Sequence, residues 1–369
     1  MSDPMTIEKD NDQTLITSPF EFGKIGIEEI TSEATLLLKN IAEASESKGL
    51  FTVKTADRWI EQAKTRPIPK MLFGEYWFEG ELCILFADSN VGKSILAVQI
   101  GDSISKGMSI GGFRLEAEAQ SIIYFDFELS EKQFETRYSK DFEEHYSFSD
   151  NFYRAEINSD DSLLHGFPSF EDYLNDSLEK AVVDTGAKVL IIDNLTYLRT
   201  ENEKAKDALP LMKNLKSLKN KYGLSIMALA HTPKRDLSKP ITGNDLQGSK
   251  MLMNFCDSAF SIGQSHKDKS TRYLKQIKSR NTEIIYDTEN VCLCHLDKPH
   301  NFLQFEFLGF GSEQEHLRHF TENDKKQAIS EVTELKKQGV PNTEIARRYG
   351  VSEGAIRKWI KKSKGTTHE

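Results

Sequence analysis

The chain has 369 residues, of which 38% are hydrophobic, 10% aromatic and 28% charged. This length suits one large domain with an appendage, and the composition excludes a wholly disordered chain and a membrane channel. The formal net charge of −9, from 48 basic and 57 acidic residues, argues as an average against nucleic acid as the partner.

Residues 1–50 form an acidic arm. They contain ten acidic and four basic residues, a formal charge of −6. Apolar residues are sparse before Leu36, which predicts a mostly flexible segment with one short helix over 27–44.

The start, MSDPMTIEKDND, is acidic where a signal peptide is basic and then apolar. No apolar run approaches the roughly 20 residues of a spanning helix. Four cysteines that form no even framework of short spacings fit a reducing compartment, so we expect a cytoplasmic protein with no membrane partner.

Residues 51–310 are predicted to form one α/β domain. Its first part, 52–70, is polar, and Pro67 and Pro69 predict an extended passage there. Short apolar runs then alternate with helical patterns, which favours a doubly wound, mainly parallel sheet flanked by helices. The expected strands are Glu81–Phe86, Ser121–Phe127, Lys188–Ile192, Leu224–Ala230, Ser258–Ile262, Tyr273–Ile277 and Phe302–Leu308.

A phosphate-binding pattern follows the first of these strands and begins a helix. It matches G-x-x-x-x-G-K-[ST] except at its first position, and it reads Ala87-Asp88-Ser89-Asn90-Val91-Gly92-Lys93-Ser94. In such a loop the backbone N–H groups face the phosphates, Lys93 reaches the outer phosphates and Ser94 binds Mg²⁺. We therefore expect ATP and Mg²⁺ as ligands. The alternative is a chance strand–turn–helix that contains Gly-Lys-Ser.

Two carboxylates are predicted to lie beside this loop. The strand KVLIID ends in Asp193, where a second carboxylate would hold Mg²⁺ through water. Asn194 follows it, not a glutamate, so the carboxylate that activates water must come from elsewhere. Glu128 ends the strand SIIYFDFELS, and the carboxyl ends of neighbouring parallel strands meet in one crevice. Glu128 is thus the expected general base, with a surface glutamate as the alternative.

These elements, followed by LSIMALAHTPK, resemble a RecA-like ATPase core. Within that class the chain is similar to ring-forming replicative helicases of the DnaB type and hexameric helicases of the RepA type. The resemblance covers roughly residues 65–310 and implies a RecA-like fold with Glu128 as general base. It also implies that His231, at the end of the fourth strand, senses the γ-phosphate. A strand-end histidine with a local hydrogen bond is the alternative.

Two further segments extend the resemblance. Lys275-Gln-Ile-Lys278-Ser-Arg280-Asn281 is similar to the K-x-R-N element with which DnaB-type helicases reach a neighbouring subunit's γ-phosphate. It implies that Lys278 and Arg280 act in trans in a homo-oligomer, by analogy a hexamer. The alternative is a solvated basic turn. The segment Asp245-Leu-Gln-Gly248-Ser249 resembles the loop that binds DNA near the central channel.

A linker over 311–322 leads to a predicted helix-turn-helix over 323–364. Counting from Asn342, Ala346 is at the fifth place and Gly350 at the ninth, which is the spacing of this motif. The tail resembles the DNA-binding domains of resolvases and transposases, and its third helix is expected to place Ser352, Arg357 and Lys358 in the major groove. A helical cap on the ATPase is the alternative. From Thr321 onward eleven basic and seven acidic residues give +4, which the overall charge conceals.

The sequence predicts an ATP-hydrolysing, DNA-associated, ring-forming motor, with a replicative-type DNA helicase of a plasmid or mobile element as the leading hypothesis. The alternative is an ATP-gated DNA-binding factor for recombination, transposition or helicase loading, without unwinding activity. The DNA partner is single-stranded, double-stranded or both. Cys292-Leu-Cys294-His295 lacks a second pair at zinc-finger spacing, and its alternation is typical of a strand.

Overall fold

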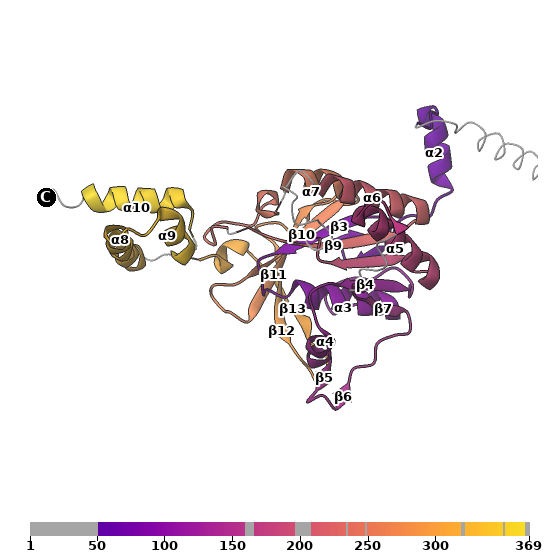
Figure 1. Ribbon diagram of the computed structural model, residues 1–369, viewed down its shortest axis with the longest axis horizontal. Coiled ribbons are helices and arrows are strands. Elements are labelled where there is room, and N and C mark those ends of the chain that lie inside the picture. Colours follow the sequence, from indigo (N-terminus) through magenta and orange to yellow (C-terminus); the bar gives the residue numbers. More distant parts are fainter. Residues whose placement is uncertain are drawn as a thin grey trace, which may run out of the picture. The chain divides into compact units, whose positions relative to one another are not determined.

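The computed structural model describes residues 51–158, 166–195, 208–233, 235–247, 249–318, 322–349 and 351–365. The acidic arm and the helix expected over 27–44 lie outside these residues, as do Gly248 and Gly350. The chain divides between Ile68 and Pro69 into two compact units. The first contains α2 (Ala56–Lys64), and the second contains the elements that follow, most of which are labelled in Figure 1.

Helix α2 corrects the expectation of an extended passage over 52–70. Thr55 is its N-cap, with a side-chain oxygen that accepts a hydrogen bond from Arg58 N at 3.4 Å. Most residues between this cap and the C-cap Thr65 are good helix formers. Pro67 and Pro69 lie beyond that C-cap, so they restrict only the segment that leaves the helix.

A nine-stranded sheet forms the centre of the second unit. Its strands are β3 (Leu82–Ala87), β4 (Ile122–Asp126), β7 (Phe152–Ala155), β8 (Val189–Asp193), β9 (Ser225–His231), β10 (Ser258–Gln264), β11 (Thr271–Lys278), β12 (Val291–Asp297) and β13 (Gln304–Gly311). Their order is β13-β12-β11-β10-β3-β9-β8-β4-β7. Neighbours from β10 to β7 run parallel, and those from β10 to β13 run antiparallel. The sheet is therefore mainly parallel, as the sequence predicts.

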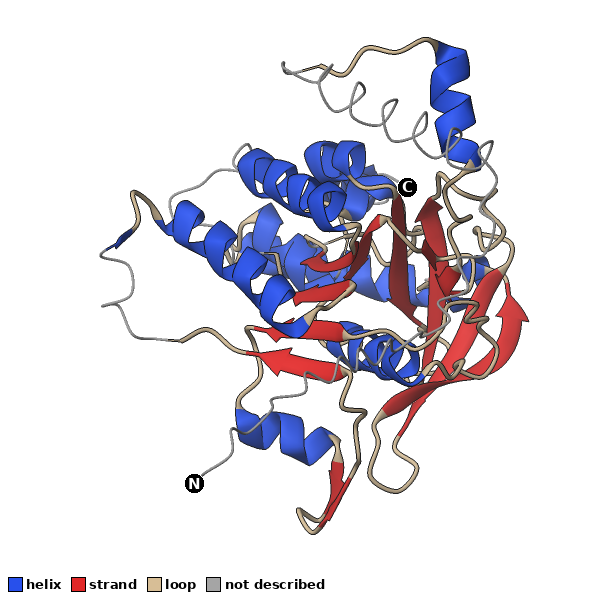
Figure 2. Cartoon of the chain, turned by 90° about the vertical axis from the view of Figure 1, so that its right-hand side faces the viewer, coloured by secondary structure: helices blue, strands red, loops and turns tan. Residues whose placement is uncertain are grey.

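Helices cover both faces of this sheet (Figure 2). Helix α3 (Lys93–Lys106) packs on one face, and α5 (Phe170–Thr185), α6 (Ala208–Tyr222) and α7 (Ser249–Phe255) pack on the other. Strand β3 alternates between the two cores, with Cys83 and Leu85 against α3 and with Ile84 and Phe86 on the opposite face. Burial on both faces explains why the parallel strands are continuous apolar runs, and it confirms the predicted α/β class with a sheet flanked by helices.

Smaller elements surround the sheet. They are the hairpin of β1 (Met71–Phe73) and β2 (Trp77–Phe78), helix α4 (Glu131–Arg137), the hairpin of β5 (Ser139–Lys140) and β6 (Glu144–His145), and 3-10 turns at Gly243–Asp245 and Glu313–His316. Neither hairpin nor β7 was expected from the sequence. Within the described ranges, the helices are all too short or too polar to cross a membrane.

Three helices form the carboxyl-terminal module. They are α8 (Glu322–Lys337), α9 (Asn342–Tyr349) and α10 (Glu353–Gly365). Val332, Ile345 and Ile356 have no exposed surface, and together with Ala346 they form a separate small core. Ser352 caps α10, because its Oγ accepts a hydrogen bond from Ala355 N at 3.2 Å. The module is a helix-turn-helix, as predicted, with the small residue Ala346 in its core.

Candidate functional site

The phosphate loop joins β3 to α3. Asn90 and Gly92 have φ angles of 63° and 108°, in a region where a residue without a Cβ is least strained. A Cβ on Gly92 would also lie 2.9 Å from Cζ of Phe305, so this position requires glycine for two reasons. Ala87 ends β3 and pairs with His231. Because Ala87 is a strand residue, alanine is tolerated where the pattern has its first glycine.

The side chain of Lys93 lies inside this loop. Its Nζ donates to the carbonyl oxygens of Ala87 and Asp88, each at 3.1 Å, and to Nδ1 of His231 at 3.2 Å. An ammonium group only donates, so Nδ1 of His231 accepts and the ring proton resides on Nε2. Burial lowers the pKa of Lys93, and the charge of Asp193 acts against this shift. The loop thus holds a buried cation where outer phosphates are expected.

A hydroxyl and a carboxylate meet at the start of α3. Asp193 is 1% exposed, and its Oδ2 accepts a hydrogen bond from Tyr124 OH at 2.7 Å. Burial raises the pKa of Asp193 to about 6, although hydrogen bonds from Ser94 and Tyr124 favour the ionised form. Oxygen donors of this kind suit Mg²⁺. The described ranges contain no group of three or more His, Cys, Asp and Glu side chains that could hold a metal ion without other ligands.

Glu128 lies beside this pair, within a polar cluster. Asn194 Nδ2 donates to Glu128 Oε1 and lies 3.1 Å from His231 Nε2. His231 Nε2 is 3.4 Å from the same Glu128 oxygen. The side chain of Glu128 is 33% exposed, so water reaches it. The fold therefore brings Lys93, Ser94, Glu128, Asp193 and His231 together, although they come from four strand ends.

Several residues of this site were not anticipated from the sequence. In the sequence Asn194 shows only that no glutamate follows Asp193, yet in the structure it contacts both Glu128 and His231. Tyr124 lies inside β4 and looks like any core residue of a buried strand. The one signal that could have found Asn194 is its place directly after Asp193, at the end of β8.

Two arginines hold the phosphate loop from neighbouring segments. Arg235 Nε lies 3.2 Å from Asp88 Oδ2, and Thr232 donates its hydroxyl to the other oxygen of that carboxylate. Arg272, at the start of β11, donates from Nε to the carbonyl oxygen of Val91 at 3.0 Å. Both arginine side chains are largely buried. They hold the phosphate loop through contacts from other segments of the chain, which the sequence pattern of the loop itself does not reveal.

Lys278 and Arg280 lie away from their own chain's phosphate loop. Lys278 Nζ donates to the carbonyl oxygens of Met253 and Cys256 near the end of α7. Arg280 Nη1 is 2.9 Å from Asp257 Oδ1, and the other oxygen of Asp257 accepts from the backbone N–H that begins β3. This is the strand end opposite to the loop. Any contact of these cations with a γ-phosphate thus requires a second copy of the chain.

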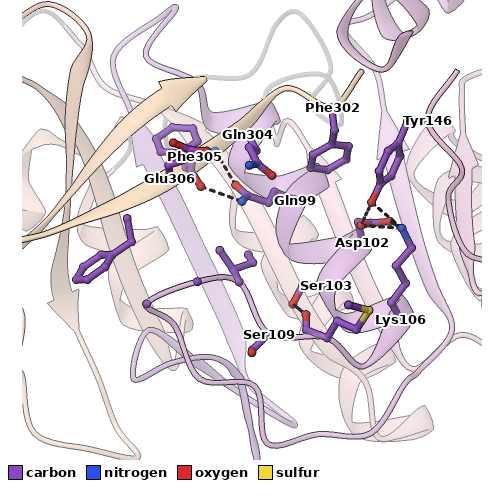
Figure 3. A pocket seen from close by; sticks show the side chains of 15 residues that line it. Gln99, Asp102, Ser103, Lys106, Ser109, Tyr146, Phe302, Gln304, Phe305 and Glu306 are labelled. Carbon is purple, nitrogen blue, oxygen red and sulfur yellow. Dashed lines mark hydrogen bonds and ion pairs between the residues drawn. The ribbon is translucent and has the colours of Figure 1, made fainter. Parts of the chain in front are cut away.

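A separate hollow of about 710 Å³ lies between α3, the loop after it and β13 (Figure 3). Two of the polar side chains that line it hold neighbouring elements together. Gln99 bonds both the N–H and the carbonyl of Phe305 at 2.9 Å, and Asp102 accepts from Tyr146 OH at 2.7 Å and from Lys106. These contacts hold β13 against α3 and place Phe305 next to Gly92. The residues that line the hollow therefore support the phosphate loop.

The expected DNA-contacting residues lie on the surface of the carboxyl-terminal module. Ser352, Arg357 and Lys358 are all exposed at the start and middle of α10. Arg357 Nη2 lies 2.7 Å from Glu353 Oε1, one turn earlier in the helix. An exposed pair of this kind is weak and can open toward a phosphate.

Family models match both the ATPase part and the carboxyl-terminal module of the chain. Residues 48–236, just over half of the chain, match the family described as "AAA domain", and residues 315–369 match the family described as "Transposase". No curated protein matches the chain. Among solved structures, a KaiC-like protein from the hyperthermophilic archaeon Pyrococcus horikoshii OT3 is similar, with 14% identity, a TM-score of 0.42 and coverage of 62% of this chain and 90% of that one. The chain belongs to the AAA domain family, as a RecA-like P-loop ATPase that carries a carboxyl-terminal helix-turn-helix.

Proposed function

We propose that the protein is an Mg²⁺-dependent ATPase that moves on DNA as a ring of identical subunits, as a replicative-type helicase of a plasmid or mobile element. The observation that supports this proposal most is the cluster of Lys93, Ser94, Glu128, Asp193 and His231 at the carboxyl ends of parallel strands. It combines a buried cation, a pair of oxygen donors and a solvent-accessible carboxylate, which are the groups that phosphoryl transfer to water uses.

In the proposed reaction, the loop amides and Lys93 bind the phosphates of ATP. Ser94 and Asp193 hold Mg²⁺, which supplies neutralisation of the phosphate charge. Glu128 orients the attacking water and accepts its proton at the carboxylate. His231 links Lys93 to Glu128 through its two ring nitrogens, so it is placed to respond to the γ-phosphate.

Lys278 and Arg280 complete the site of an adjacent subunit in this proposal. They lie at the strand ends opposite to their own phosphate loop, so a head-to-tail arrangement is needed to bring them to ATP. A cation supplied in trans neutralises charge that develops in the transition state. A closed ring, by analogy a hexamer, is the arrangement in which every subunit has such a neighbour.

DNA is the proposed partner. The helix-turn-helix exposes Ser352, Arg357 and Lys358 on α10, and exposed Arg347 and Arg348 on α9 add positive charge. Such a surface neutralises phosphates and binds DNA with an affinity that falls as salt rises. Duplex is the expected ligand of this module, because an α-helix fits the major groove.

The Lys93→Ala variant tests the ATPase. We expect it to abolish ATP hydrolysis while duplex DNA still binds through the helix-turn-helix, measured by phosphate release and by fluorescence anisotropy. Lys132→Ala is the matched control, because Lys132 is an exposed lysine on α4 whose side chain pairs with Glu135 and lies over the Phe142 ring. Equal ATP hydrolysis by the Lys93→Ala and wild-type proteins would refute the proposal.

The second candidate is an ATP-gated DNA-binding factor that does not unwind DNA. The helix-turn-helix favours it, because a motor that threads a single strand does not itself need to recognise a duplex. In this case DNA stimulates ATP hydrolysis, but a forked duplex stays intact. Strand separation therefore distinguishes the two functions.

A further inference from the structure

The segment that carries Glu128 is held by one buried carboxylate. Asp126 ends β4, two residues before Glu128, and its side chain has no exposed surface. Its Oδ1 accepts hydrogen bonds from the backbone N–H of Glu128 at 3.2 Å and of Leu129 at 2.9 Å. This carboxylate therefore closes a turn that fixes the direction in which the Glu128 side chain leaves the backbone.

Arg154 holds the same segment from the neighbouring strand β7. Its Nε and Nη2 lie 3.0 and 2.9 Å from Asp126 Oδ2, and Nη2 also donates to the Leu129 carbonyl at 2.8 Å. The guanidinium lies 4.7 Å from the centre of the Phe134 ring, and Nη1 pairs with Glu156. Arg154 thus contacts both the carboxylate that shapes the turn and the backbone on the far side of Glu128.

We propose that Asp126 and Arg154 are positioning residues that set where the Glu128 carboxylate meets the attacking water. The proposal rests on the proposed role of Glu128. Asn194 and His231 contact the carboxylate end of Glu128, while Asp126 and Arg154 fix its backbone end. A general base must stand within hydrogen-bond reach of the water proton, and a displacement of about 1 Å costs about 100-fold in rate.

A double-mutant cycle tests this role. Arg154→Met is expected to lower kcat for ATP about 10- to 100-fold, with ATP affinity within about twofold of wild type, because Lys93, Ser94 and the phosphate loop do not contact Arg154. In the Glu128→Gln background, where no base remains to be positioned, Arg154→Met is expected to leave the residual kcat unchanged. Arg114→Met is the matched control, because Arg114 pairs with Glu75 and is largely exposed.

The outcomes separate this proposal from the assignment of the base. An equal fold-loss from Arg154→Met in both backgrounds, or an unchanged kcat in the wild-type background, would overturn the positioning role. If Glu128→Gln itself retains wild-type kcat, the base assignment fails instead, and the proposed function with it.

Two milder substitutions keep the test decisive if Arg154→Met does not fold, which thermal melting reports. Arg154→Lys retains the charge but cannot bond Asp126 and the Leu129 carbonyl in the same bidentate manner. Asp126→Asn retains an oxygen for the two amides but loses the ion pair. Both are expected to lower kcat without raising KM. The loss of kcat in the variant that combines Arg154→Lys with Asp126→Asn is expected to be smaller than the product of the two single losses. A loss equal to that product contradicts the proposal.

Discussion

At the level of single residues, the phosphate loop is most sensitive at Gly92. Its φ of 108° strains any L-residue, and the ring of Phe305 occupies the space of a Cβ. Gly92→Ala is expected to cost about 1–3 kcal/mol in the loop conformation, and to weaken ATP binding about 10- to 100-fold. Titration with a fluorescent ATP analogue measures this. Gly111→Ala is the control, since it has an ordinary φ and open space around its Cβ. Equal affinities for both variants would contradict the account.

Asp193 makes the metal-free protein sensitive to pH. Burial raises its pKa to about 6, from an ordinary value of 3.8. Between these two pH values the folded chain holds a proton that the unfolded chain has released, so the free energy of unfolding falls as the pH rises. Above pH 6 the loss levels off at about 3 kcal/mol.

Asp193→Asn removes this ionisation and still accepts the hydrogen bond from Tyr124. Without metal and nucleotide, we expect the variant and the wild type to be similarly stable near pH 4. At pH 7.5 the variant is expected to be more stable by about 2–3 kcal/mol, in urea unfolding. Asp184→Asn, at an exposed position on α5, is the control. A difference between variant and wild type that does not change with pH would count against the burial of a charge at Asp193.

The residues predictable from the sequence are those next to strand ends. Lys93, Glu128 and Asp193 each follow a recognisable apolar run, and parallel topology then brings them together. Arg154 and Tyr124 were not predictable in this way. Their roles depend on contacts between strands far apart in sequence, such as the bond from Tyr124 to Asp193, and local patterns carry no information about such pairs.

At the level of elements, parallel strands were more predictable than the structure around them. β3, β4, β8 and β9 are buried on both faces, so each is a continuous apolar run of the kind expected. β7 is an edge strand that contains charged Arg154 and exposed Tyr153, and it lacks that signal. Helix α2 forms where the two prolines predicted an extended passage, because its cap and its helix-forming residues outweigh the prolines that lie beyond it.

Helix α10 is the element expected to bind DNA. Arg357 and Lys358 are exposed on it, next to the buried Ile356 that anchors the helix. Arg357→Ala and Lys358→Ala are each expected to weaken duplex binding about tenfold and to reduce the dependence of affinity on salt, because each removes a positive charge from the interface. Anisotropy at several salt concentrations measures both quantities. Lys132→Ala, on α4 of the ATPase, is the control. Unchanged affinity and salt slope in both α10 variants would exclude this helix as the DNA-binding element.

At the level of the whole molecule, charge is divided between the ends. The overall −9 contains an arm of −6 and a tail of +4, so the average conceals a basic module. The proposed trans contacts also belong to this level, because Lys278 and Arg280 cannot act on their own chain's loop.

Mixing two inactive variants tests the trans contacts. Lys93→Ala removes the phosphate-binding cation, and Arg280→Ala removes the cation offered to the neighbour. In a random equal mixture, about one interface in four pairs an intact loop with an intact Arg280. Hydrolysis is therefore expected to recover to about a quarter of the wild-type rate. The double variant mixed with Arg280→Ala is the control and is expected to stay inactive. A mixture as inactive as its components would exclude Arg280 as a trans residue.

The most direct test of the motor is strand separation on a forked DNA duplex with ATP and Mg²⁺. The account predicts that the wild-type protein releases the labelled strand only when ATP is hydrolysed. Glu128→Gln and Lys93→Ala are expected to release none, although both still bind the fork. DNA-stimulated ATP hydrolysis by the wild type with the duplex left intact would contradict the helicase and support the ATP-gated DNA-binding factor.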